Sequence, residues 1–306
     1  MIKRDTVNLR SYLRKMVREL GMLNRACSGT ELSPLQSHIL IELNAKPSGV
    51  TELASQLCVD KASMSRTLSS LINSGVIIRS NNQSDRRFSE FCLSELGKEK
   101  LSLIEDNSNK FIEEALSSSS DSEYLELFQA IKGFSTSLRN NRRQKEADMT
   151  IRKIEEKDNE AIAEIIRSSF VENKIDHLEG VSLHDPSLSR LSDFYVGNQM
   201  GYWVVEANGI IVGGAGIYPL DGEDGVCEMQ KLYFSRKVKG MGMGRRMIAF
   251  ILEKASEMKY KQCYIETLDE LKDAVKLYES FGFVHLPESL GNTGHSSCNI
   301  CMLRTL

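Results

Sequence analysis

The stretch EMQKLYFSRKVKGMGMGRR at residues 228–246 decides the fold of the second half of the chain. Residues 228–234 have the composition of a strand, and residues 244–259 have the apolar spacing of a helix. Glycines occupy alternate positions from Gly240 to Gly244 between them. Glycines at a helix N-terminus leave backbone N–H groups and the positive end of the helix dipole open to a pyrophosphate. The stretch therefore predicts a strand, a phosphate-binding loop and a helix in succession.

Two common nucleotide-binding loops do not fit this stretch. The Walker loop ends in Gly-Lys-Ser/Thr, and the dinucleotide fingerprint needs a glycine where Arg245 stands. The stretch instead resembles the acetyl-CoA loop of the GNAT acetyltransferase superfamily, Arg/Gln-x-x-Gly-x-Gly/Ala. Lys239 stands where Arg or Gln is usual, which keeps a positive charge but loses the guanidinium geometry. A second motif of the superfamily, A-x-x-L-Tyr-x-x-x-Gly-Phe, is matched by AVKLYESFGF at 274–283.

The elements around these motifs alternate between helix and strand. Asp158 is in position to cap a helix, and Asn208-Gly209 joins two strands within 202–213. A strand at 262–267, a helix at 271–281 and terminal strands follow. The order predicts an α/β layout, and the resemblance, which covers 149–306, implies a GNAT fold with a mixed, strongly twisted sheet.

The resemblance also implies a reaction and a set of site residues. In this superfamily an amine attacks the thioester of acetyl-CoA, the cosubstrate, and a tyrosine commonly protonates the departing thiolate. Tyr278 is the matching residue, although it could equally be a core residue, because it shares a helix face with Leu277 and Phe281. Glu228 is the candidate base, or else a solvated carboxylate or an amine contact. The residues expected to bind the cofactor, including a backbone oxyanion donor near Leu232 or Tyr233, are Leu232, Tyr233, Phe234, Lys239, Gly240, Met241, Gly242, Met243, Gly244 and Arg245.

The first half of the chain has the pattern of a helix-turn-helix. Thr51 can cap a short helix, and Asp60 can cap a second helix that runs to Asn73. In the second helix the apolar residues are spaced by four and three, and hydroxyls with one arginine form the opposite face. Such a face suits a DNA major groove, and on its own it equally suits solvent. The candidate DNA contacts, including two wing arginines, are Lys61, Ser63, Arg66, Thr67, Ser70, Arg86 and Arg87.

Several motifs in this half resemble the MarR family of winged-helix regulators. They are TELA at 51–54, DKASMSR at 60–66, LINSGVIIR at 71–79 and DRR at 85–87. The resemblance covers roughly residues 5–140 and implies a mostly helical α+β winged helix that binds double-stranded DNA. It also implies a homodimer built from the first and last helices, which would bind a pseudo-palindromic operator. We place the domain boundary in the polar segment 137–148, giving domains 1–148 and 149–306.

The composition agrees with a two-domain protein whose cysteines are reduced thiols. The chain has 306 residues, and residues 1–98 hold 14 Lys and Arg against 9 Asp and Glu, whereas 149–306 hold 18 against 23. The seven scattered cysteines favour a cytoplasmic location, and no signal peptide, membrane span or membrane partner is expected. His295, Cys298 and Cys301 lack a second ligand pair, so no metal is expected.

The favoured function is a dimeric regulator that binds DNA and acetylates a primary amine in a ternary complex. The acceptor could be a small molecule or a protein lysine, and the acidic second half favours a cationic one. Two alternatives remain. The GNAT domain could only sense acyl-CoA, or the winged helix could only dimerise.

Overall fold

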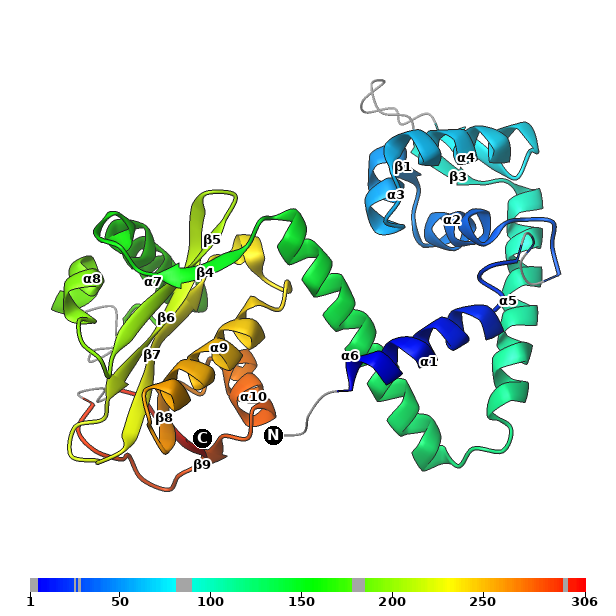
Figure 1. The fold of residues 1–306 in the computed structure, drawn as a ribbon. Coiled ribbons are helices and arrows are strands. Elements are labelled where there is room, and N and C mark those ends of the chain that lie inside the picture. Colours follow the sequence, from blue (N-terminus) through cyan, green and yellow to red (C-terminus); the bar gives the residue numbers. More distant parts are fainter. Residues whose placement is uncertain (1–4, 25, 27–28, 81–89, 178–184, 294–296) are drawn as a thin grey trace. The chain divides into compact units, whose positions relative to one another are not determined.

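The computed structural model describes residues 5–24, 26, 29–80, 90–177, 185–293 and 297–306. The chain folds into two compact units, Met1–Glu126 and Leu127–Leu306 (Figure 1). The division falls inside helix α6. The domain boundary predicted after Asp148 lies just beyond the end of that helix and stays a prediction.

The first unit is mostly helical and has a small antiparallel sheet in the order β1-β3-β2. Its elements are α1 (Thr6–Glu19), α2 (Pro34–Ala45), β1 (Ser48–Gly49), α3 (Val50–Gln56), α4 (Lys61–Asn73), β2 (Ile77–Ser80), β3 (Glu90–Leu93) and α5 (Glu95–Leu116). The core is formed by α2, α3, α4, the strands and the first half of α5. This is the mostly helical winged-helix arrangement predicted from the sequence.

The helix-turn-helix is held by local capping and by one buried face. Asp60 caps α4 as expected, because its side chain accepts a hydrogen bond from the Ser63 backbone N–H (2.8 Å). Met64 and Leu68 are fully buried. The expected cap of α3 is wrong: the helix begins at Val50, so its capping position is Gly49, and Thr51 lies inside the first turn.

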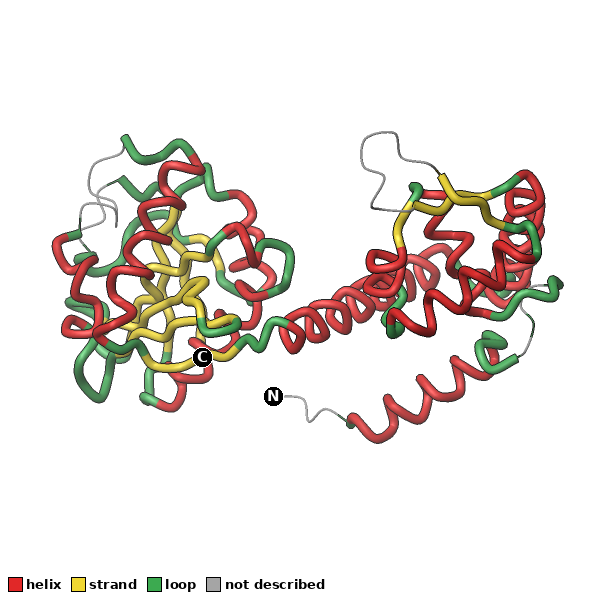
Figure 2. The backbone as a smooth tube through the Cα atoms, turned by 90° about the horizontal axis from the view of Figure 1, so that it is seen from above, coloured by secondary structure: helices red, strands yellow, loops and turns green. Residues whose placement is uncertain are grey.

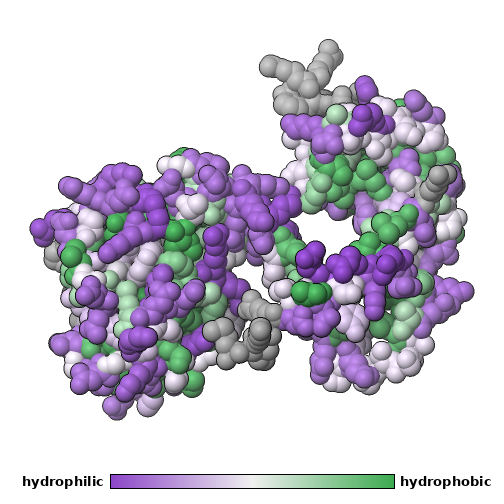
Figure 3. All heavy atoms as spheres, in the orientation of Figure 1, coloured by the Kyte–Doolittle hydropathy of each residue, from purple (hydrophilic) through white to green (hydrophobic). Residues whose placement is uncertain are grey.

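Helix α6 (Asp121–Glu146) continues through the polar segment in which the domain boundary was placed. None of its residues is buried, and its apolar side chains are half exposed. Helix α1 also has no buried residue. Figure 3 shows patches of apolar side chains on the surface of the first unit.

The second unit is built on a seven-stranded sheet in the order β4-β5-β6-β7-β8-β10-β9, with β7 and β8 as its parallel pair. Its strands are β4 (Thr150–Lys153), β5 (Gly201–Ala207), β6 (Ile210–Pro219), β7 (Val226–Phe234), β8 (Gln262–Thr267), β9 (Val284–His285) and β10 (Ile300–Thr305). Its helices are α7 (Asn159–Asn173), α8 (Leu191–Phe194), α9 (Met243–Glu257) and α10 (Lys272–Ser280). This confirms the α/β layout with a mixed sheet.

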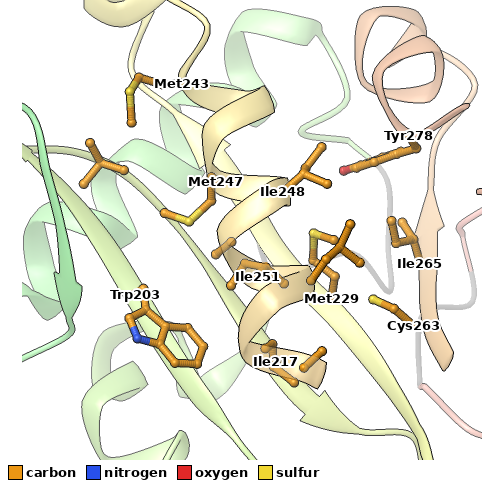
Figure 4. Packing of buried hydrophobic residues seen from close by; sticks show 14 of the residues in the cluster. Trp203, Ile217, Met229, Met243, Met247, Ile248, Ile251, Cys263, Ile265 and Tyr278 are labelled. Carbon is orange, nitrogen blue, oxygen red and sulfur yellow. The ribbon is translucent and has the colours of Figure 1, made fainter. Parts of the chain in front are cut away.

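Helices cover both faces of this sheet (Figure 2). On one face α9 and α10 pack on the sheet, with Met247, Ile248 and Ile251 of α9 fully buried (Figure 4). On the other face α7 and α8 form a second core with Tyr195 and Tyr202. The two cores hold β7 and β8 at the centre of the unit, where the predicted site residues lie.

Candidate functional site

The two parallel strands at the centre of the sheet stay paired over only three residues. Val226, Cys227 and Glu228 of β7 pair with β8, whereas β7 continues to Phe234 and β8 to Thr267 without further pairing to each other. The backbone groups of β7 beyond Glu228 that face β8 therefore have no strand partner. A cavity of about 450 Å³ lies beside this segment, and its lining includes Glu228, Leu232 and Tyr278.

A β-bulge changes the direction of β7 within the unpaired segment. Lys231 has a left-handed backbone (φ +51°), which a side chain other than glycine rarely adopts. Two contacts hold it: the Tyr202 hydroxyl donates to its carbonyl (3.0 Å), and its buried ammonium lies 2.7 Å from Asp185 Oδ2. Burial alone would raise the pKa of Asp185, but the hydrogen bond and charge of Lys231 outweigh it and lower that pKa. The pair fixes the backbone that precedes Leu232.

Glu228 is buried and oriented by its neighbours on the same strand face. The Gln230 side-chain amide donates to Glu228 Oε2, and the Tyr195 hydroxyl donates to Gln230 Oε1 (2.6 Å). Burial raises the pKa of Tyr195 well above its ordinary value, so this phenol stays a donor. Sequence reasoning missed Gln230 and Tyr195. The two-residue spacing from Glu228 was a signal for Gln230, but the approach of Tyr195 depends on packing between distant elements.

Tyr278 reaches the cavity from α10. Its ring packs edge-on against Phe283 and points from α10 toward Ile248 of α9 (Figure 4). Its hydroxyl has no hydrogen-bond partner among the residues that the structure describes. Burial raises the pKa of Tyr278 well above 10, so the phenol is protonated at neutral pH. The residue belongs to the core and also lines the cavity, so the catalytic role and the core role both stay predictions.

A second carboxylate, Glu266 of β8, also lines this cavity. It accepts hydrogen bonds from the Tyr264 hydroxyl and from the Thr293 hydroxyl, both at 2.6 Å. Cys298 lies in the same lining, and burial raises the pKa of its thiol. The carboxylates of Glu228 and Glu266 can each accept a hydrogen bond from a cationic group.

The glycine loop has the geometry that a phosphate site needs. Gly240 and Gly242 have left-handed backbones (φ +74° and +75°), and Gly242 is the residue that precedes α9. The N-terminal N–H groups of α9 are therefore open beside the loop. The expected cofactor residues divide between the first cavity and a second one. The first is lined by Leu232, Tyr233, Phe234 and Lys239, and the second by Phe234, Lys239, Gly240, Gly242, Met243, Gly244 and Arg245. Met241 lines neither cavity, and its carbonyl accepts a hydrogen bond from Gln144 of α6.

The candidate DNA contacts of α4 lie together on the face opposite the core. Lys61, Arg66 and Ser70 are exposed, and Ser63 and Thr67 are half-buried. The Arg66 guanidinium donates to the Ser63 hydroxyl (3.0 Å), which holds the arginine along the helix. Arg86 and Arg87 lie outside the described residues.

Within the described ranges, no three His, Cys, Asp or Glu side chains are grouped as metal ligands. His295, which was considered as a ligand, lies outside those ranges. No helix that the structure describes is long and apolar enough to cross a bilayer.

The fold and the site define an acyltransferase-type domain that follows a winged helix. Residues 159–283 match the Acetyltransferase (GNAT) family, and residues 32–88 match the MarR family. The uncharacterized N-acetyltransferase YjgM of Escherichia coli (strain K12) is 42% identical over 157 residues, which are 51% of this chain and 94% of that protein. The chain therefore belongs to the GNAT N-acetyltransferase family, and its first unit carries a MarR-family domain.

Solved structures are similar to each unit. One is yncA, a putative acetyltransferase from Salmonella typhimurium solved with its cofactor acetyl-CoA. It is 20% identical, with a TM-score of 0.42, over 52% of this chain and 94% of that chain. Another is the transcriptional regulator BldR from Sulfolobus solfataricus. It is 22% identical, with a TM-score of 0.36, over 42% of this chain and 95% of that chain.

Proposed function

We propose that this protein is an acetyl-CoA-dependent N-acetyltransferase that acts on a primary amine and carries a DNA-binding MarR-type domain. One observation carries the enzymatic part: Glu228 and Tyr278 line the same cavity, at the point where β7 and β8 stop pairing. A carboxylate that can accept a proton and a phenol that can donate one are the two groups that acyl transfer to an amine requires.

The residues present fit acetyl-CoA. The unpaired backbone of β7 offers N–H groups to an extended chain, and the loop Lys239–Arg245 offers N–H groups and positive charge to a diphosphate. When bound, acetyl-CoA supplies the acetyl thioester. No metal is proposed.

The chain's own residues then have distinct roles. Glu228 takes a proton from the incoming ammonium, through water, so that the neutral amine can attack the thioester carbonyl. A backbone N–H near Leu232 or Tyr233 donates to the carbonyl oxygen as negative charge develops on it. The carbon–nitrogen bond forms, the carbon–sulfur bond breaks, and the Tyr278 hydroxyl gives its proton to the departing sulfur. The second proton that the attacking nitrogen loses then returns to the Tyr278 oxygen.

The acceptor is proposed to be a cationic amine, either a small molecule or a protein lysine. The support is the two carboxylates of Glu228 and Glu266 on neighbouring strands. The lining also holds Glu270 and Asp273, against Lys231, Lys239 and Lys272. Because a cation gains energy in an acidic pocket that is partly shielded from water, such an acceptor binds there more tightly than a neutral one.

The first unit is proposed to bind a pseudo-palindromic double-stranded operator as a homodimer, with half-sites about one helical turn (~10 bp) apart. The support is the polar face of α4 together with the exposed apolar faces of α1 and α6, which a partner copy would cover. A regulator must reach DNA, so a cytoplasmic location follows from the same proposal.

Free thiol release from acetyl-CoA, followed with a panel of primary amines, tests the enzymatic proposal. We expect turnover with at least one cationic amine. Binding of acetyl-CoA with no turnover on any amine would instead favour the alternative that this domain senses acyl-CoA. Selection from random oligonucleotides tests the DNA-binding part, and no sequence preference would favour a winged helix that only dimerises.

A further inference from the structure

A second cavity of the second unit, about 1000 Å³ in volume, lies between the glycine loop and α6. One wall is the loop from Gly240 to Arg245. The opposite wall is one polar face of α6, formed by Gln129, Lys132, Gly133, Thr136, Ser137 and Asn140. Nothing in the sequence motifs of either family points to this helix as part of a ligand site.

Direct contacts join the loop to the helix. The Gln144 side-chain amide donates to the Met241 carbonyl (2.7 Å), and the Arg246 guanidinium donates to Gln144 Oε1 (3.0 Å). A Cβ atom at Gly242 would lie only 2.6 Å from Asn140 Nδ2, so the glycine is what allows this approach. The loop and α6 therefore form one site.

Asn140 carries a polar atom that needs a partner. Its Oδ1 is buried and has no hydrogen-bond partner within the part of the chain that the structure describes. Buried polar atoms are nearly always hydrogen-bonded, and an exception points to a missing ligand or water. A side-chain amide both donates and accepts, and it can turn to present either group. When the amide is turned, its Nδ2 group stands where Oδ1 is, and in that orientation it can donate to a phosphate oxygen.

The charge of the cavity identifies the chemistry of that ligand. Four cationic side chains line it, Lys132, Arg236, Lys239 and Arg245, against the two carboxylates of Glu172 and Asp273. Glu172 is already paired with Arg236 (2.8 Å). The excess of positive charge favours a phosphorylated molecule.

The spacing along α6 matches a molecule that carries phosphates at two places. Lys132 stands two helical turns before Asn140, about 12 Å along the helix axis. Asn140 is beside the glycine loop, where a diphosphate would bind. Lys132 lies farther out, where the phosphorylated ribose of a nucleotide would extend.

We propose that α6 is the second wall of the acyl-CoA site: Asn140 hydrogen-bonds the diphosphate, and Lys132 pairs with the 3′-phosphate of the adenosine end. The inference rests on the proposed binding of acyl-CoA to this unit. It adds a ligand contact from a helix that begins in the first unit of the chain.

Titration calorimetry of the full chain with CoA tests the role of Asn140. Asn140→Asp keeps the size of the side chain and places a negative charge against the diphosphate, so affinity for CoA should fall by at least about tenfold. Asn141→Asp makes the same change one residue later, on an exposed side chain outside this cavity, and should change affinity by less than about twofold.

The role of Lys132 is tested with two ligands. Lys132→Gln should weaken CoA binding by about five- to tenfold and leave 3′-dephospho-CoA within about twofold, because the latter lacks the phosphate that the lysine contacts. Arg139→Gln removes a cation from the same helix outside the cavity and should affect neither ligand.

The outcomes separate this inference from the proposed function. If the unmodified protein does not bind CoA, the proposed function and this inference both fail. Only this inference is overturned if the unmodified protein binds CoA and the Asn140 and Lys132 variants, shown by circular dichroism to be folded, bind CoA as well as their control variants do. If Lys132→Gln lost the same factor of affinity for CoA and for 3′-dephospho-CoA, that result would also contradict this inference.

Discussion

Tyr278 belongs to the core and also lines the first cavity, so its hydroxyl oxygen can be removed with little effect on packing. Tyr278→Phe should lower turnover by roughly 10²–10⁴-fold, the usual contribution of general acid catalysis. The affinity for acetyl-CoA should stay nearly constant, because the lost interaction is made in the transition state. Steady-state kinetics and calorimetry measure the two effects. Full activity in a folded Tyr278→Phe protein would assign the residue to the core alone.

Glu228 allows a prediction about pH. Glu228→Gln keeps a similar shape but removes the group that takes the proton from the ammonium. At neutral pH the rate should fall about 10²-fold. It should recover as pH rises toward the pKa of the free amine, because solvent then supplies the neutral amine. The dependence of kcat/KM on pH measures this, and a loss that is equal at all pH values would place Glu228 in acceptor binding. Burial keeps Tyr278 protonated over this range, so that phenol does not add an alkaline limb.

The junction of β4 with α7 is held by a buried ion pair whose effect depends on pH. The Arg152 guanidinium donates to both oxygens of Asp158 (2.6 and 2.9 Å), and the Glu155 backbone N–H donates to Asp158 Oδ2. Burial by itself would raise the pKa of Asp158, but the hydrogen bonds and the charge of Arg152 lower it. A lowered folded-state pKa contributes stability above the ordinary value of about 4, and this is lost as pH falls through the folded-state value.

Asp158→Asn should therefore destabilise the second unit by about 2 kcal/mol at pH 7, because the partly buried Arg152 loses its two-point charge partner and keeps only its ion pair with Glu206. The difference from the unmodified protein should shrink below pH 4. Urea unfolding followed by the fluorescence of Trp203, the single tryptophan, measures it. Lys157→Gln breaks a neighbouring exposed pair and should have little effect on stability, because solvent screens that pair. Equal effects of the two changes would contradict the assignment.

Helix α4 was predicted from the sequence because its determinants are local. The Asp60 cap and the spacing of Met64, Leu68 and Leu71 depend only on neighbours along the chain. Helix α2 has an equally local signal in its capping box, Ser33 with Gln36, which the sequence analysis did not use. Asp158 stands at the predicted capping position of α7, but its side chain accepts hydrogen bonds from the Arg152 guanidinium and the Glu155 backbone N–H instead. Such competition for a side chain cannot be read from spacing.

The part of the site that could be predicted is the part that lies in or next to sequence motifs. The glycine loop and Tyr278 are motif positions, and Glu228 lies on the strand that precedes the loop. The structure brings Glu228 and Tyr278 to one cavity. The separation of β7 from β8, the bulge at Lys231 with its Asp185 partner, and the contact of Asn140 with Gly242 join residues that are distant in sequence. These contacts depend on how elements pack, and spacing along one strand or helix contains no information about them.

Arg66 is the residue of α4 that we propose to contact a base edge. Arg66→Ala should relax sequence preference by roughly 1–3 kcal/mol at one position per half-site, because arginine contacts guanine through two hydrogen bonds. Lys61→Ala should weaken binding to all sequences alike and reduce the dependence on salt, as the loss of a phosphate contact does. Binding to a panel of operator variants at two salt concentrations measures both. An unchanged preference in Arg66→Ala would show that another residue of α4 reads the bases.

Helix α6 begins in the first unit and ends in the second, so one element carries side chains of both. If acyl-CoA binds against this helix and operator DNA binding favours one arrangement of the same helix, the two ligands are linked. Linkage is reciprocal: acetyl-CoA must change operator affinity by the same factor by which operator DNA changes acetyl-CoA affinity. A coupling of about 1–3 kcal/mol corresponds to a change of about 5–150-fold. Operator affinity with and without saturating acetyl-CoA gives one factor, and calorimetry of acetyl-CoA with and without operator gives the other. Asn140→Asp should reduce the effect of a fixed, sub-saturating acetyl-CoA concentration on operator affinity, whereas Asn141→Asp should leave it unchanged. If the factor is one in both directions while each ligand binds, the two functions are independent and α6 acts only as a connection.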